Sequence, residues 1–407
     1  MNEHDQPADL VDPSVTALGT LLGPEAEDFL SAVLNPVGGD LESFRVAQVR
    51  YVPGSSVTVQ YRAAVRWAKQ GKTSETLIAM SGLDVPEEVP VFSDGDVRIA
   101  FWRYPDDPFL PGLAAAADPH RVGRLLESLG AASGTVRLRR RAYRAGRRAV
   151  IEAFTPQSRI FLKIVRPARV EALQRRHVAL ASQIPVPRSL GWAEDQGLVA
   201  LQAMPGRTLR KALESGTRRL PEGSKVTALL DSLPDPDASA ATRKGPRDRA
   251  PAHARLLNSV LPRLTDRVDA IVGRLSETAV DESEVPVHGD FHSSQILVRG
   301  NDIVGIIDVD TAGRGHRSDD LAGLLGHLAT LSLSTSTRRA IDRYGSELIR
   351  DFDVDTDPAS VRRTVAAVVL GLATGPFRVQ QSRWASETER RISLSERWLD
   401  SADAVDG

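Results

Sequence analysis

The spacing of apolar residues predicts helices and strands in a definite order along the chain. Residues 26–34 carry apolar side chains at helical spacing, whereas residues 44–51 and 57–61 alternate apolar and polar positions, as half-buried strands do. A Pro-Gly-Ser turn signal separates the two strands, and residues 77–80 form a third expected strand. The first part of the chain therefore predicts a helical segment followed by an antiparallel sheet.

A second stretch repeats this pattern. Its expected elements are a strand, an arginine-rich turn and two further strands, at residues 136–143, 144–148, 149–153 and 160–165. Tyr143 follows Tyr51 by 92 positions, and Gly146 follows Gly54 by the same 92 positions. We interpret the two stretches as a degenerate internal repeat, with the general similarity of β-hairpins as the alternative. Only the second copy ends in a strand that contains a lysine, Lys163.

The rest of the chain alternates between expected helix and strand. A helix is expected at 169–182, before two prolines, and an apolar strand at 198–204. Residues 231–250 are rich in Pro, Asp, Ala, Arg and Lys and have few apolar positions, which predicts a flexible insertion. From about residue 253 onward the pattern is mainly helical, except for a β-like island at 287–310.

Composition narrows the class of protein. Apolar residues make up 41% and charged residues 26% of the 407 residues, which is typical of globular proteins and excludes a wholly disordered or fibrous chain. Lys and Arg number 52 and Asp and Glu 53, so the net charge is −1 and no basic excess favours a nucleic-acid partner. Within the arginine-rich stretch 137–148, strand alternation places Arg137, Arg139 and Arg141 on one face and Leu138 on the other, which is typical of a solvated strand face. The absence of cysteine excludes disulfides, thiolate catalysis and cysteine-bound zinc.

No segment predicts a membrane span or a signal peptide. The longest apolar stretch, 365–374, is about half of the roughly 20 residues that a spanning helix needs. The N-terminal segment is acidic and polar and lacks the apolar core of a signal peptide. We therefore expect no membrane partner and a cytoplasmic location.

The β-like island contains the side chains best suited to chemistry. Asp290 and Gln295 lie on one short loop, and the segments on either side of Gly300 are expected to pair as a β-hairpin. That hairpin would return Asp308 to the side of Gln295 and Asp290. Two carboxylates and a carboxamide would then converge, and these hard oxygen ligands suit Mg²⁺.

The residues of this island resemble the aminoglycoside phosphotransferase, or small-molecule kinase, family. The matching motifs are His-Gly-Asp-Phe-His at 288–292, the hairpin strand beginning at Gln295, Ile-Asp-Val-Asp at 307–310 and Asp-Leu-Ala at 320–322. The Gly-Pro-Phe-Arg sequence at 375–378, with Trp384, is similar to bacterial members of the family. The resemblance covers roughly residues 130–400.

This resemblance implies a protein-kinase-like, two-lobed α+β fold, with a small β-rich N-lobe and a larger helical C-lobe. We expect the N-lobe at residues 116–204 and the C-lobe, with the flexible insertion, at 205–407. Residues 1–115 would form an additional N-terminal α+β cap module that resembles a degenerate N-lobe without the lysine. The sequence leaves open whether this module is a lid, a dimer interface or a substrate-shaping cap. It also leaves the oligomeric state open.

The resemblance implies roles for individual residues of the island. Asp290 resembles the catalytic aspartate that orients the acceptor hydroxyl and takes its proton, and His288 resembles the histidine that holds the catalytic loop in place. Asp308 matches the aspartate that binds Mg²⁺, and Gln295 is a second expected metal ligand. Asp310 is expected either to add a ligand or to cap the next turn.

Other polar residues of the C-lobe have expected structural roles. Asp320 resembles the aspartate that braces the catalytic loop through backbone N–H groups. His292 and His316 are expected to be polar loop residues, because Mg²⁺ prefers oxygen ligands. The acidic stretch 351–357 would bind a polycationic acceptor only if it faced the cleft, and we expect a solvated loop instead.

On the N-terminal side the resemblance implies the nucleotide-binding residues. Lys163 resembles the lysine that pairs with the α- and β-phosphates, and the turn around Gly146 would cover the phosphates. Gln202 and Met204 lie in the expected hinge, where backbone groups would bind adenine.

One family position departs from the pattern. The helix after Lys163 should carry a glutamate that holds this lysine, but the corresponding residue is Arg176. Two acids are expected as substitutes, either Glu171 in the same helix or Glu152 on the neighbouring strand.

These features predict an ATP-dependent phosphotransferase, with GTP as an alternative donor and Mg²⁺ as cofactor. Its expected acceptor is a hydroxyl group of a small polar molecule, either aminoglycoside-like, a sugar or an amino alcohol. A polycationic acceptor would require a site lined by carboxylates. The alternative is a nucleotide-binding pseudokinase or regulatory module. The missing glutamate favours this alternative, whereas Asp290, Asp308 and Lys163 oppose it.

Overall fold

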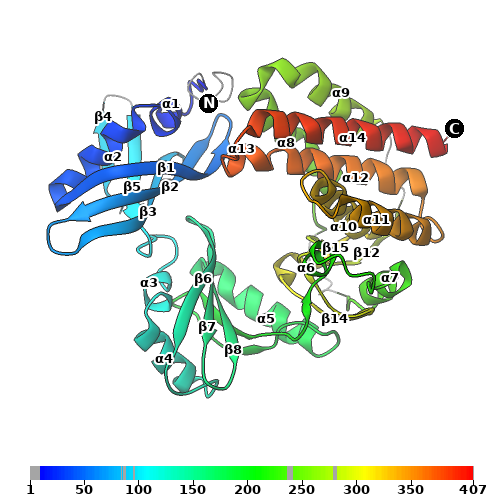
Figure 1. The fold of residues 1–407 in the computed structure, drawn as a ribbon, viewed down its shortest axis with the longest axis horizontal. Helices are drawn as coiled ribbons and strands as arrows, with labels where there is room; N and C mark the ends of the chain where they lie inside the picture. The colour runs from blue at the N-terminus through cyan, green and yellow to red at the C-terminus, as the bar shows by residue number, and fades with distance from the viewer. Residues whose placement is uncertain are drawn as a thin grey trace.

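Two five-stranded antiparallel sheets form the N-terminal half of the chain (Figure 1). The computed structural model describes residues 10–83, 85, 89–94, 97–235, 242–277 and 282–406. The first sheet has the strand order β1-β2-β3-β5-β4. Its strands are β1 (Gly39–Val52), β2 (Ser56–Trp67), β3 (Gly71–Gly82), β4 (Val91–Asp94) and β5 (Val97–Arg103), preceded by helices α1 (Ala17–Leu22) and α2 (Ala26–Leu34). We call the described residues up to Arg103 the N-terminal module.

The second sheet repeats the topology of the first. Its strand order is β6-β7-β8-β10-β9, which matches the first sheet strand for strand. The strands are β6 (Arg137–Arg144), β7 (Arg148–Phe154), β8 (Arg159–Val165), β9 (Ser189–Ala193) and β10 (Leu198–Gln202). The helices of this unit are α3 (Leu113–Ala116), α4 (Pro119–Ser128) and α5 (Val170–Ala181), and α5 is inserted between β8 and β9. The predicted internal repeat is therefore present in the fold.

A shared hydrogen-bond motif strengthens the evidence for this repeat. In the N-terminal module, Asp12 Oδ2 accepts hydrogen bonds from the Tyr51 hydroxyl and the Gly54 N–H, both at 2.7 Å. In the second unit, one aspartate oxygen, Asp107 Oδ2, accepts from Tyr143 at 2.7 Å and from the Gly146 N–H at 2.8 Å. Both glycines adopt a positive φ, of 73° and 67°, in the turn that joins the first two strands. The repeat thus also includes the segment that carries the aspartate, which precedes α1 and α2 in the first unit and α3 and α4 in the second.

The ladder registers identify the residue that replaces the lysine in the first copy. Lys163 on β8 lies opposite Val150 on β7. The equivalent pair in the first sheet, at the same distance from the turn, is Met80 opposite Thr58. Met80 is 1% exposed and belongs to the apolar core between the two sheets. The first sheet therefore has an apolar side chain where the second has its lysine.

The C-terminal half is mainly helical, and it confirms the predicted two-lobed, kinase-like α+β class with an extra N-terminal module. The helices are α6 (Leu209–Glu214), α7 (Gly223–Asp231), α8 (Pro246–Val260), α9 (Thr265–Ser276), α10 (Arg317–Ser332), α11 (Arg338–Phe352), α12 (Pro358–Ala373), α13 (Gly375–Arg378) and α14 (Trp384–Asp406). The short strands are β11 (Arg207–Thr208), β12 (Glu284–Val287), β13 (Ile296–Arg299), β14 (Asp302–Ile306) and β15 (Gly313–His316). Within the described ranges no helix combines the length and apolar character that crossing a membrane requires.

The stretch expected to be a flexible insertion is partly helical. Residue Asp231 still belongs to α7, and α8 begins at Pro246, so residues 246–250 are helix rather than irregular chain. Proline at the first helical position and Asp248, whose Oδ2 accepts from the Gly245 N–H at 2.8 Å, are strong signals for a helix start. Residues 236–241 lie outside the described residues.

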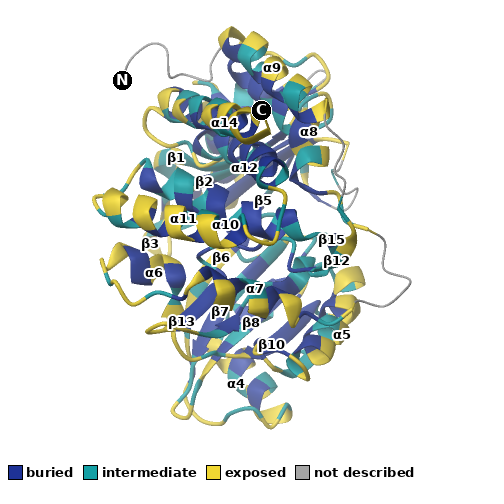
Figure 2. Ribbon diagram, turned by 90° about the vertical axis from the view of Figure 1, so that its right-hand side faces the viewer, coloured by how far each residue is buried: buried dark blue, intermediate teal, exposed yellow. Residues whose placement is uncertain are grey.

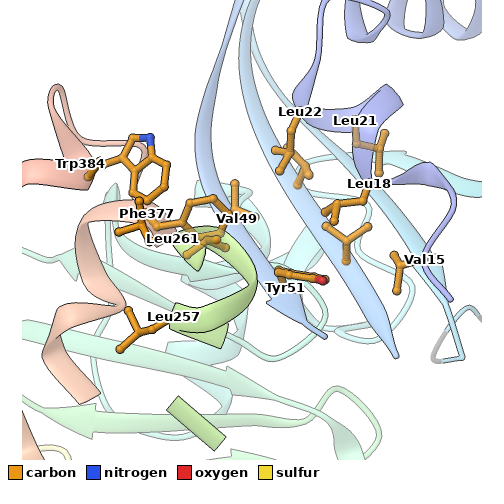
Figure 3. Close-up of a cluster of buried hydrophobic side chains, with 14 of the residues drawn as sticks. Val15, Leu18, Leu21, Leu22, Val49, Tyr51, Leu257, Leu261, Phe377 and Trp384 are labelled. Carbon is orange, nitrogen blue, oxygen red and sulfur yellow. The ribbon is translucent and has the colours of Figure 1, made fainter. Parts of the chain in front are cut away.

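The N-terminal module packs against both other parts of the chain. Figure 3 shows Val49 and Tyr51 of the module facing Leu257, Phe377 and Trp384 of the C-lobe, and all of these side chains are buried in one apolar cluster. A second cluster joins the opposite face of the first sheet to the second sheet. Figure 2 shows β7, β8 and β10 of the second sheet as mainly buried, while the outer surfaces of helices such as α11 are exposed. The module therefore forms a second connection between the N-lobe and the C-lobe, beside the chain segment that follows β10.

We propose a domain boundary that follows the repeat. Helix α3 packs against β8, and Asp107 ties the segment ahead of α3 to the first hairpin of the second sheet. This favours a start of the second unit near Asp107, ahead of the expected boundary at residue 115. The expected boundary at residue 204 stays a prediction.

The paired aspartates of the repeat give a matched test of buried hydrogen bonding. Asp107 is 4% exposed, so its replacement leaves the Tyr143 hydroxyl and the Gly146 N–H without an acceptor in an apolar region. Asp107→Ala should lower the free energy of unfolding by about 2–4 kcal/mol. Asp12→Ala should lower it by about 1 kcal/mol, because the hydrogen bonds of Asp12 are more accessible to water. Urea unfolding of both variants measures the difference. Equal losses would contradict this ranking.

Candidate active site

The hairpin of β13 and β14 brings the metal-site residues together. Arg299 pairs with Asp302 across Gly300, and Ile296 pairs with Ile306. The ladder continues with a hydrogen bond from the Ile307 N–H to the Gln295 carbonyl at 2.9 Å. Asp308 then lies beside Gln295, whose Nε2 is 3.3 Å from Asp308 Oδ2. The hairpin expected from the sequence is thus present.

The backbone of the His-Gly-Asp loop is held by a buried carboxylate. Asp320 at the start of α10 accepts hydrogen bonds from the N–H groups of His288 at 2.6 Å and Gly289 at 2.8 Å. Burial raises the pKa of Asp320, and these two N–H groups favour its charged form. Asp320 therefore lies where the sequence predicts a brace for the loop that carries Asp290.

His288 connects this loop to the segment that carries Asp308. The His288 ring is fully buried, and its Nε2 lies 3.1 Å from the Ile307 carbonyl. Its Nδ1 accepts the Asp290 N–H at 3.3 Å, so Nε2 carries the proton and donates to Ile307. Both ring nitrogens are engaged by backbone groups, which agrees with the expected structural role and leaves no free nitrogen for base catalysis.

Gly289 allows the loop to approach its neighbours closely. It has a φ of 76°, and a Cβ at this position would lie 2.7 Å from the Thr311 carbonyl oxygen. The same carbonyl accepts a hydrogen bond from the Arg243 guanidinium, and the Thr311 hydroxyl donates to the His288 carbonyl at 3.0 Å. Only glycine satisfies both the left-handed backbone and the short contact.

Four charged side chains meet where the second sheet faces the hairpin. Lys163 Nζ donates to Asp308 Oδ1 at 2.7 Å and also to Asp310 Oδ1. Arg148 Nη1 lies 3.3 Å from Asp308 Oδ1 and 3.4 Å from Asp310 Oδ2. Burial raises the pKa of Asp308, but the charges of Lys163 and Arg148 outweigh burial and hold this pKa at about 2. Asp308 is therefore ionised at neutral pH.

The backbone at Asp308 turns its carboxylate into this group. Asp308 has φ 61° and ψ 45°, a left-handed conformation that aspartate tolerates better than most residues. The chain leaves the β14 ladder here and enters a short 3-10 turn at Val309–Thr311. Asp310, within that turn, faces Lys163 and Arg148, so its side chain joins the charged group rather than capping a helix.

The structure corrects the expected partner of Lys163. Glu171 pairs with Arg175 at 3.8 Å, and its side chain is 60% exposed. Glu152 instead pairs with two arginines of the neighbouring strands. Within the described residues neither glutamate contacts Lys163, so both expected substitutes are wrong and the lysine is held by Asp308 and Asp310. The reason is electrostatic, because arginines closer to each glutamate neutralise it.

Arg176 and Arg148 are site residues that the sequence analysis did not identify as such. Arg176 occupies the position of the missing glutamate, and its Nη1 donates to the Asp310 carbonyl at 2.7 Å. It therefore supports the turn of Asp310 from the backbone side. Arg148 belongs to the arginine-rich stretch interpreted as a solvated strand face. Arg148 is the first residue of β7, directly after the turn, and this position could have indicated from the sequence that its side chain faces the cleft.

Two histidines near the hairpin are neutral packing groups. The rings of His292 and His327 stack with centroids 4.2 Å apart and planes at 14°. Burial lowers the pKa of His292, and it lowers the pKa of His327 to about 3. His292 Nε2 lies 3.3 Å from Gln295 Nε2 and so helps to place this amide. In the described part of the chain, no three His, Cys, Asp or Glu side chains lie together as possible metal ligands, so a metal ligand set at the hairpin would have to include the Gln295 amide.

Asp290 opens onto a cavity in the C-lobe. Its side chain is 47% exposed, and its Oδ1 lies 4.0 Å from His292 Nε2. A cavity of about 150 Å³ lies beside it, between α8, α10 and α12. We call this the Asp290 cavity, and its polar lining includes Arg249, His253, Asp319 and His327. The catalytic candidate therefore borders a space for a small polar molecule.

At the expected nucleotide-binding residues, some backbone groups are hydrogen-bonded within the protein and others are not. The Gly146 N–H is held by Asp107, and its carbonyl accepts from Arg166 Nε at 2.8 Å, so this turn is fixed by protein contacts. In the hinge, the Gln202 N–H donates to the Arg188 carbonyl at 2.9 Å. Across the described residues, the Met204 N–H has no hydrogen-bond acceptor. Of the two expected hinge residues, Met204 is thus the one with a free donor.

The acidic stretch 351–357 has structural contacts. Asp351 accepts from the Gly223 N–H at 2.8 Å, Asp353 pairs with Arg362 at 2.7 Å, and Asp357 caps α12 through the Ala359 N–H at 2.9 Å. These carboxylates stabilise loops and helix ends and do not line the Asp290 cavity.

Comparisons with known proteins agree on the kind of protein. The family model described as phosphotransferase enzyme family (APH) matches residues 141–361, more than half of the 407 residues. No curated protein sequence matches the chain significantly.

Several solved structures are similar to part of the chain. A thermostable variant of aminoglycoside phosphotransferase APH(4)-Ia, in a ternary complex with AMP-PNP and hygromycin B, is 18% identical with a TM-score of 0.49 and covers 68% of this chain and 98% of its own. The gentamicin complex of APH(2″)-IIa is 13% identical with a TM-score of 0.47 and covers 68% of this chain and 95% of its own. APH(3″)-Id from Streptomyces rimosus is 18% identical with a TM-score of 0.45 and covers 62% of this chain and 98% of its own.

The environment of Asp319 predicts a specific pH dependence of stability. Burial raises the pKa of Asp319 to about 6, whereas an aspartate in the unfolded chain titrates near 3.8. The folded chain therefore binds this proton more tightly, so the Asp319 carboxyl makes the free energy of unfolding fall as the pH rises from about 4 to about 6. Asp319→Asn removes this titration. The free energy of unfolding of the variant, relative to that of wild type, should therefore rise by about 1–3 kcal/mol from about pH 4 to about pH 7.

Urea unfolding of wild type and Asp319→Asn at these two pH values measures the change. Asparagine keeps an oxygen that can accept the His316 N–H, as Asp319 Oδ2 does at 3.4 Å, so the start of α10 is retained. A constant difference between the two proteins across this pH range would contradict the assignment.

Proposed function

Because the chain belongs to the phosphotransferase enzyme family and is thus a phosphotransferase, we propose that it transfers the γ-phosphate of ATP to a hydroxyl group of a small polar molecule. The observation that carries this proposal is the meeting of Lys163 from the second sheet with Asp308 from the hairpin, directly beside the loop that carries Asp290. His292 interacts electrostatically with both Asp290 and Asp308, which supports their placement on one side of the cleft.

The donor set at the hairpin fits a magnesium ion. Asp308 and Asp310 both contact the single Lys163 Nζ, so their carboxylates lie close together, and the Gln295 amide is adjacent. These are oxygen donors, and none of them is a soft ligand. In our proposal Asp308, Asp310 and Gln295 hold Mg²⁺, which when bound neutralises charge on the donor phosphates.

Lys163 and Arg148 bind the donor phosphates in this proposal. Both cations are now paired with Asp308 and Asp310, and phosphate oxygens would offer them charged acceptors of the same kind. Arg148 presents a planar fork that suits two phosphate oxygens, whereas Lys163 acts as a compact charge. The Met204 N–H, which has no acceptor in the described residues, would donate to the base of the nucleotide at the hinge. GTP is kept as an alternative donor.

Asp290 positions and deprotonates the acceptor hydroxyl. The carboxylate is accessible, and its loop is fixed by Asp320 and by both ring nitrogens of His288. A fixed carboxylate lowers the entropy cost of aligning the hydroxyl oxygen with the γ-phosphate. It accepts the hydroxyl proton as the new oxygen–phosphorus bond forms, while the bond from the γ-phosphorus to the bridging oxygen breaks and ADP leaves.

The Asp290 cavity favours a neutral acceptor such as a sugar over a polycationic one. Asp319 is the other carboxylate in its lining, and burial keeps the pKa of that group near 6. Arg249 adds a positive charge, and burial lowers the pKa of His253, which favours a neutral ring. An aminoglycoside would need several carboxylates here. We further propose a cytoplasmic location, and the absence of nucleic-acid and membrane partners stays a prediction.

Replacement of the catalytic candidate should separate chemistry from binding. Asp290→Asn keeps the size of the side chain but removes the base, so kcat should fall at least about 100-fold while the affinity for Mg²⁺-AMP-PNP stays within about twofold. Turnover is measured with Mg²⁺-ATP against a panel of sugars, amino alcohols and aminoglycosides. If wild type turns over no acceptor and equals Asp290→Asn, the pseudokinase alternative replaces the enzyme proposal.

Replacement of the metal candidate should act on binding itself. Asp308→Asn removes one charge from the hairpin and should weaken Mg²⁺-dependent AMP-PNP binding about 100-fold. Asp302→Asn is the matched control, because Asp302 lies at the far end of the same hairpin and pairs with Lys225 at 2.6 Å. Calorimetric titration with and without Mg²⁺ measures both variants. Equal Mg²⁺-dependent affinity in Asp308→Asn and wild type would refute the metal assignment.

A further inference from the structure

Four arginines from three separate parts of the fold surround one small polar cavity. Arg50 comes from β1 of the N-terminal module, Arg144 ends β6, Arg147 lies in the turn between β6 and β7, and Arg378 ends α13. The cavity has a volume of about 60 Å³, and helix α13 packs against β1 beside it. The remaining lining is mainly polar: Gln48, Thr58, Gln60 and Ala145. We call these four arginines the arginine site.

The positive charge of the arginine site is not balanced by the protein. Among the described residues, no carboxylate forms an ion pair with any of the four guanidinium groups, and no side chain or carbonyl accepts a hydrogen bond from them. Burial lowers the pKa of Arg147 to about 10, and the charges of Arg50, Arg144 and Arg148 add to this effect. Burial and the charges of Arg148 and Arg378 likewise lower the pKa of Arg144. Like charges at this spacing repel one another and destabilise the unliganded fold.

A second orphaned polar group lies in the same cavity. Gln60 lines it, and Gln60 Oε1 is buried and has no hydrogen-bond partner in the described part of the chain. A buried amide oxygen without a partner costs free energy, unless a ligand or a turned amide satisfies it. As placed, this oxygen is an acceptor and would not bind an anion, whereas the same amide turned about its last bond presents Nε2 as a donor to the cavity. The arginines without ion pairs therefore carry the anion site, and the turned Gln60 amide would add one donor to it.

The arginine site lies next to the proposed chemistry. Arg144 interacts electrostatically with both Asp290 and Asp308, the proposed base and metal ligand. Arg378 interacts in the same way with His253, which lines the Asp290 cavity. Arg148, which follows Arg147 directly, contacts Asp308. An anion in the arginine site would thus lie near Asp290 and Asp308.

The Gly-Pro-Phe-Arg sequence explains how Arg378 is held there. Phe377 is 2% exposed and packs edge-on against Trp384 with ring centroids 5.1 Å apart. Gln380 Nε2 donates to the Phe377 carbonyl at 2.6 Å and closes the turn after α13. The backbone of Arg378 is therefore held in place by the buried Phe377 beside it, while the Arg378 side chain is exposed.

We propose that Arg50, Arg144, Arg147 and Arg378 form an anion-binding site that takes a phosphate group, with the N-terminal module supplying one of its four cations. The phosphate has two possible sources with the same chemistry, the polyphosphate of the nucleotide or a phosphate ester on the sugar-like substrate. This inference rests on the proposed function for its place in the reaction. The binding of phosphate itself does not depend on turnover.

The test uses the full chain and compares two arginine replacements. The double variant Arg50→Gln, Arg378→Gln keeps polar side chains but removes two charges, and neither residue is among those assigned to catalysis. The matched control is Arg45→Gln, because Arg45 lies on the same strand, is exposed and lies outside the cavity. Calorimetric titration with pyrophosphate should show binding to wild type and to Arg45→Gln. It should be weakened about tenfold or more in the double variant.

Two further titrations distinguish the sources. Weaker binding of Mg²⁺-AMP-PNP by the double variant, with unchanged binding of glucose 6-phosphate, assigns the site to the nucleotide. The reverse result assigns it to a phosphorylated substrate or product. The proposal is overturned if wild type binds no pyrophosphate, or if the double variant binds all three probes as tightly as Arg45→Gln. These measurements need no turnover, so they can fail while the Asp290→Asn experiment succeeds, and the reverse.

Thermal unfolding separates a binding role from a structural one. Removing two repelling charges should leave the unliganded melting temperature of the double variant equal to or above that of wild type. Pyrophosphate should raise the melting temperature of wild type and of Arg45→Gln more than that of the double variant. A double variant that melts below wild type without ligand and responds to pyrophosphate as wild type does would mean that these arginines serve the fold, and would overturn the proposal.

Discussion

The contact of Lys163 and Arg148 with Asp308 and Asp310 is the interaction on which the arrangement of the site depends. Neither pair of charges would be stable alone, because burial raises the free energy of an isolated carboxylate or ammonium by several kcal/mol. The two cations belong to the second sheet and the two acids to the hairpin of the C-lobe, so the charges are balanced only when the lobes face each other. The same balance keeps the pKa of Asp308 at about 2 and makes it available as an anionic ligand. In the function proposed above, a nucleotide that bound these two cations would leave the two acids free to hold a metal ion.

The chain fixes its turns near the site by one recurring device, a carboxylate that accepts two donors. Asp320 holds the N–H groups of His288 and Gly289, and Asp107 holds Tyr143 and Gly146. The N-terminal module uses the same arrangement without having the lysine. It also packs on both the second sheet and the C-lobe helices, as Figures 1 and 3 show. The module therefore limits how far the two lobes can separate, since a single hinge segment is not their only link.

The local sequence pattern predicted secondary structure that depends on neighbouring residues. It did not predict ion pairs between residues that are far apart in the sequence. The helix at Ala26–Leu34 and the hairpin around Gly300 follow from apolar spacing and turn residues, and the structure has both. The partner of Lys163 did not follow, because Glu152 is neutralised by arginines on adjacent strands. Which charges meet is decided by the packing of whole elements. The start of α8 was missed for another reason, because the charged and proline-rich composition of residues 231–250 outweighed the local signals of Pro246 and Asp248.

The overall net charge of −1 hides a marked separation of charge within the cleft. Among the described residues, the four arginines of the arginine site form no ion pair with a carboxylate, whereas Asp308 and Asp310 are paired with Lys163 and Arg148. A protein free of other constraints would lose unmatched arginines, because each substitution that removes one relieves repulsion. Their convergence from a strand, a turn and a helix end is therefore better explained by a bound anion than by folding. Since Arg50 lies on β1, this explanation also gives the N-terminal module a part in ligand binding, in addition to its part in holding the lobes together.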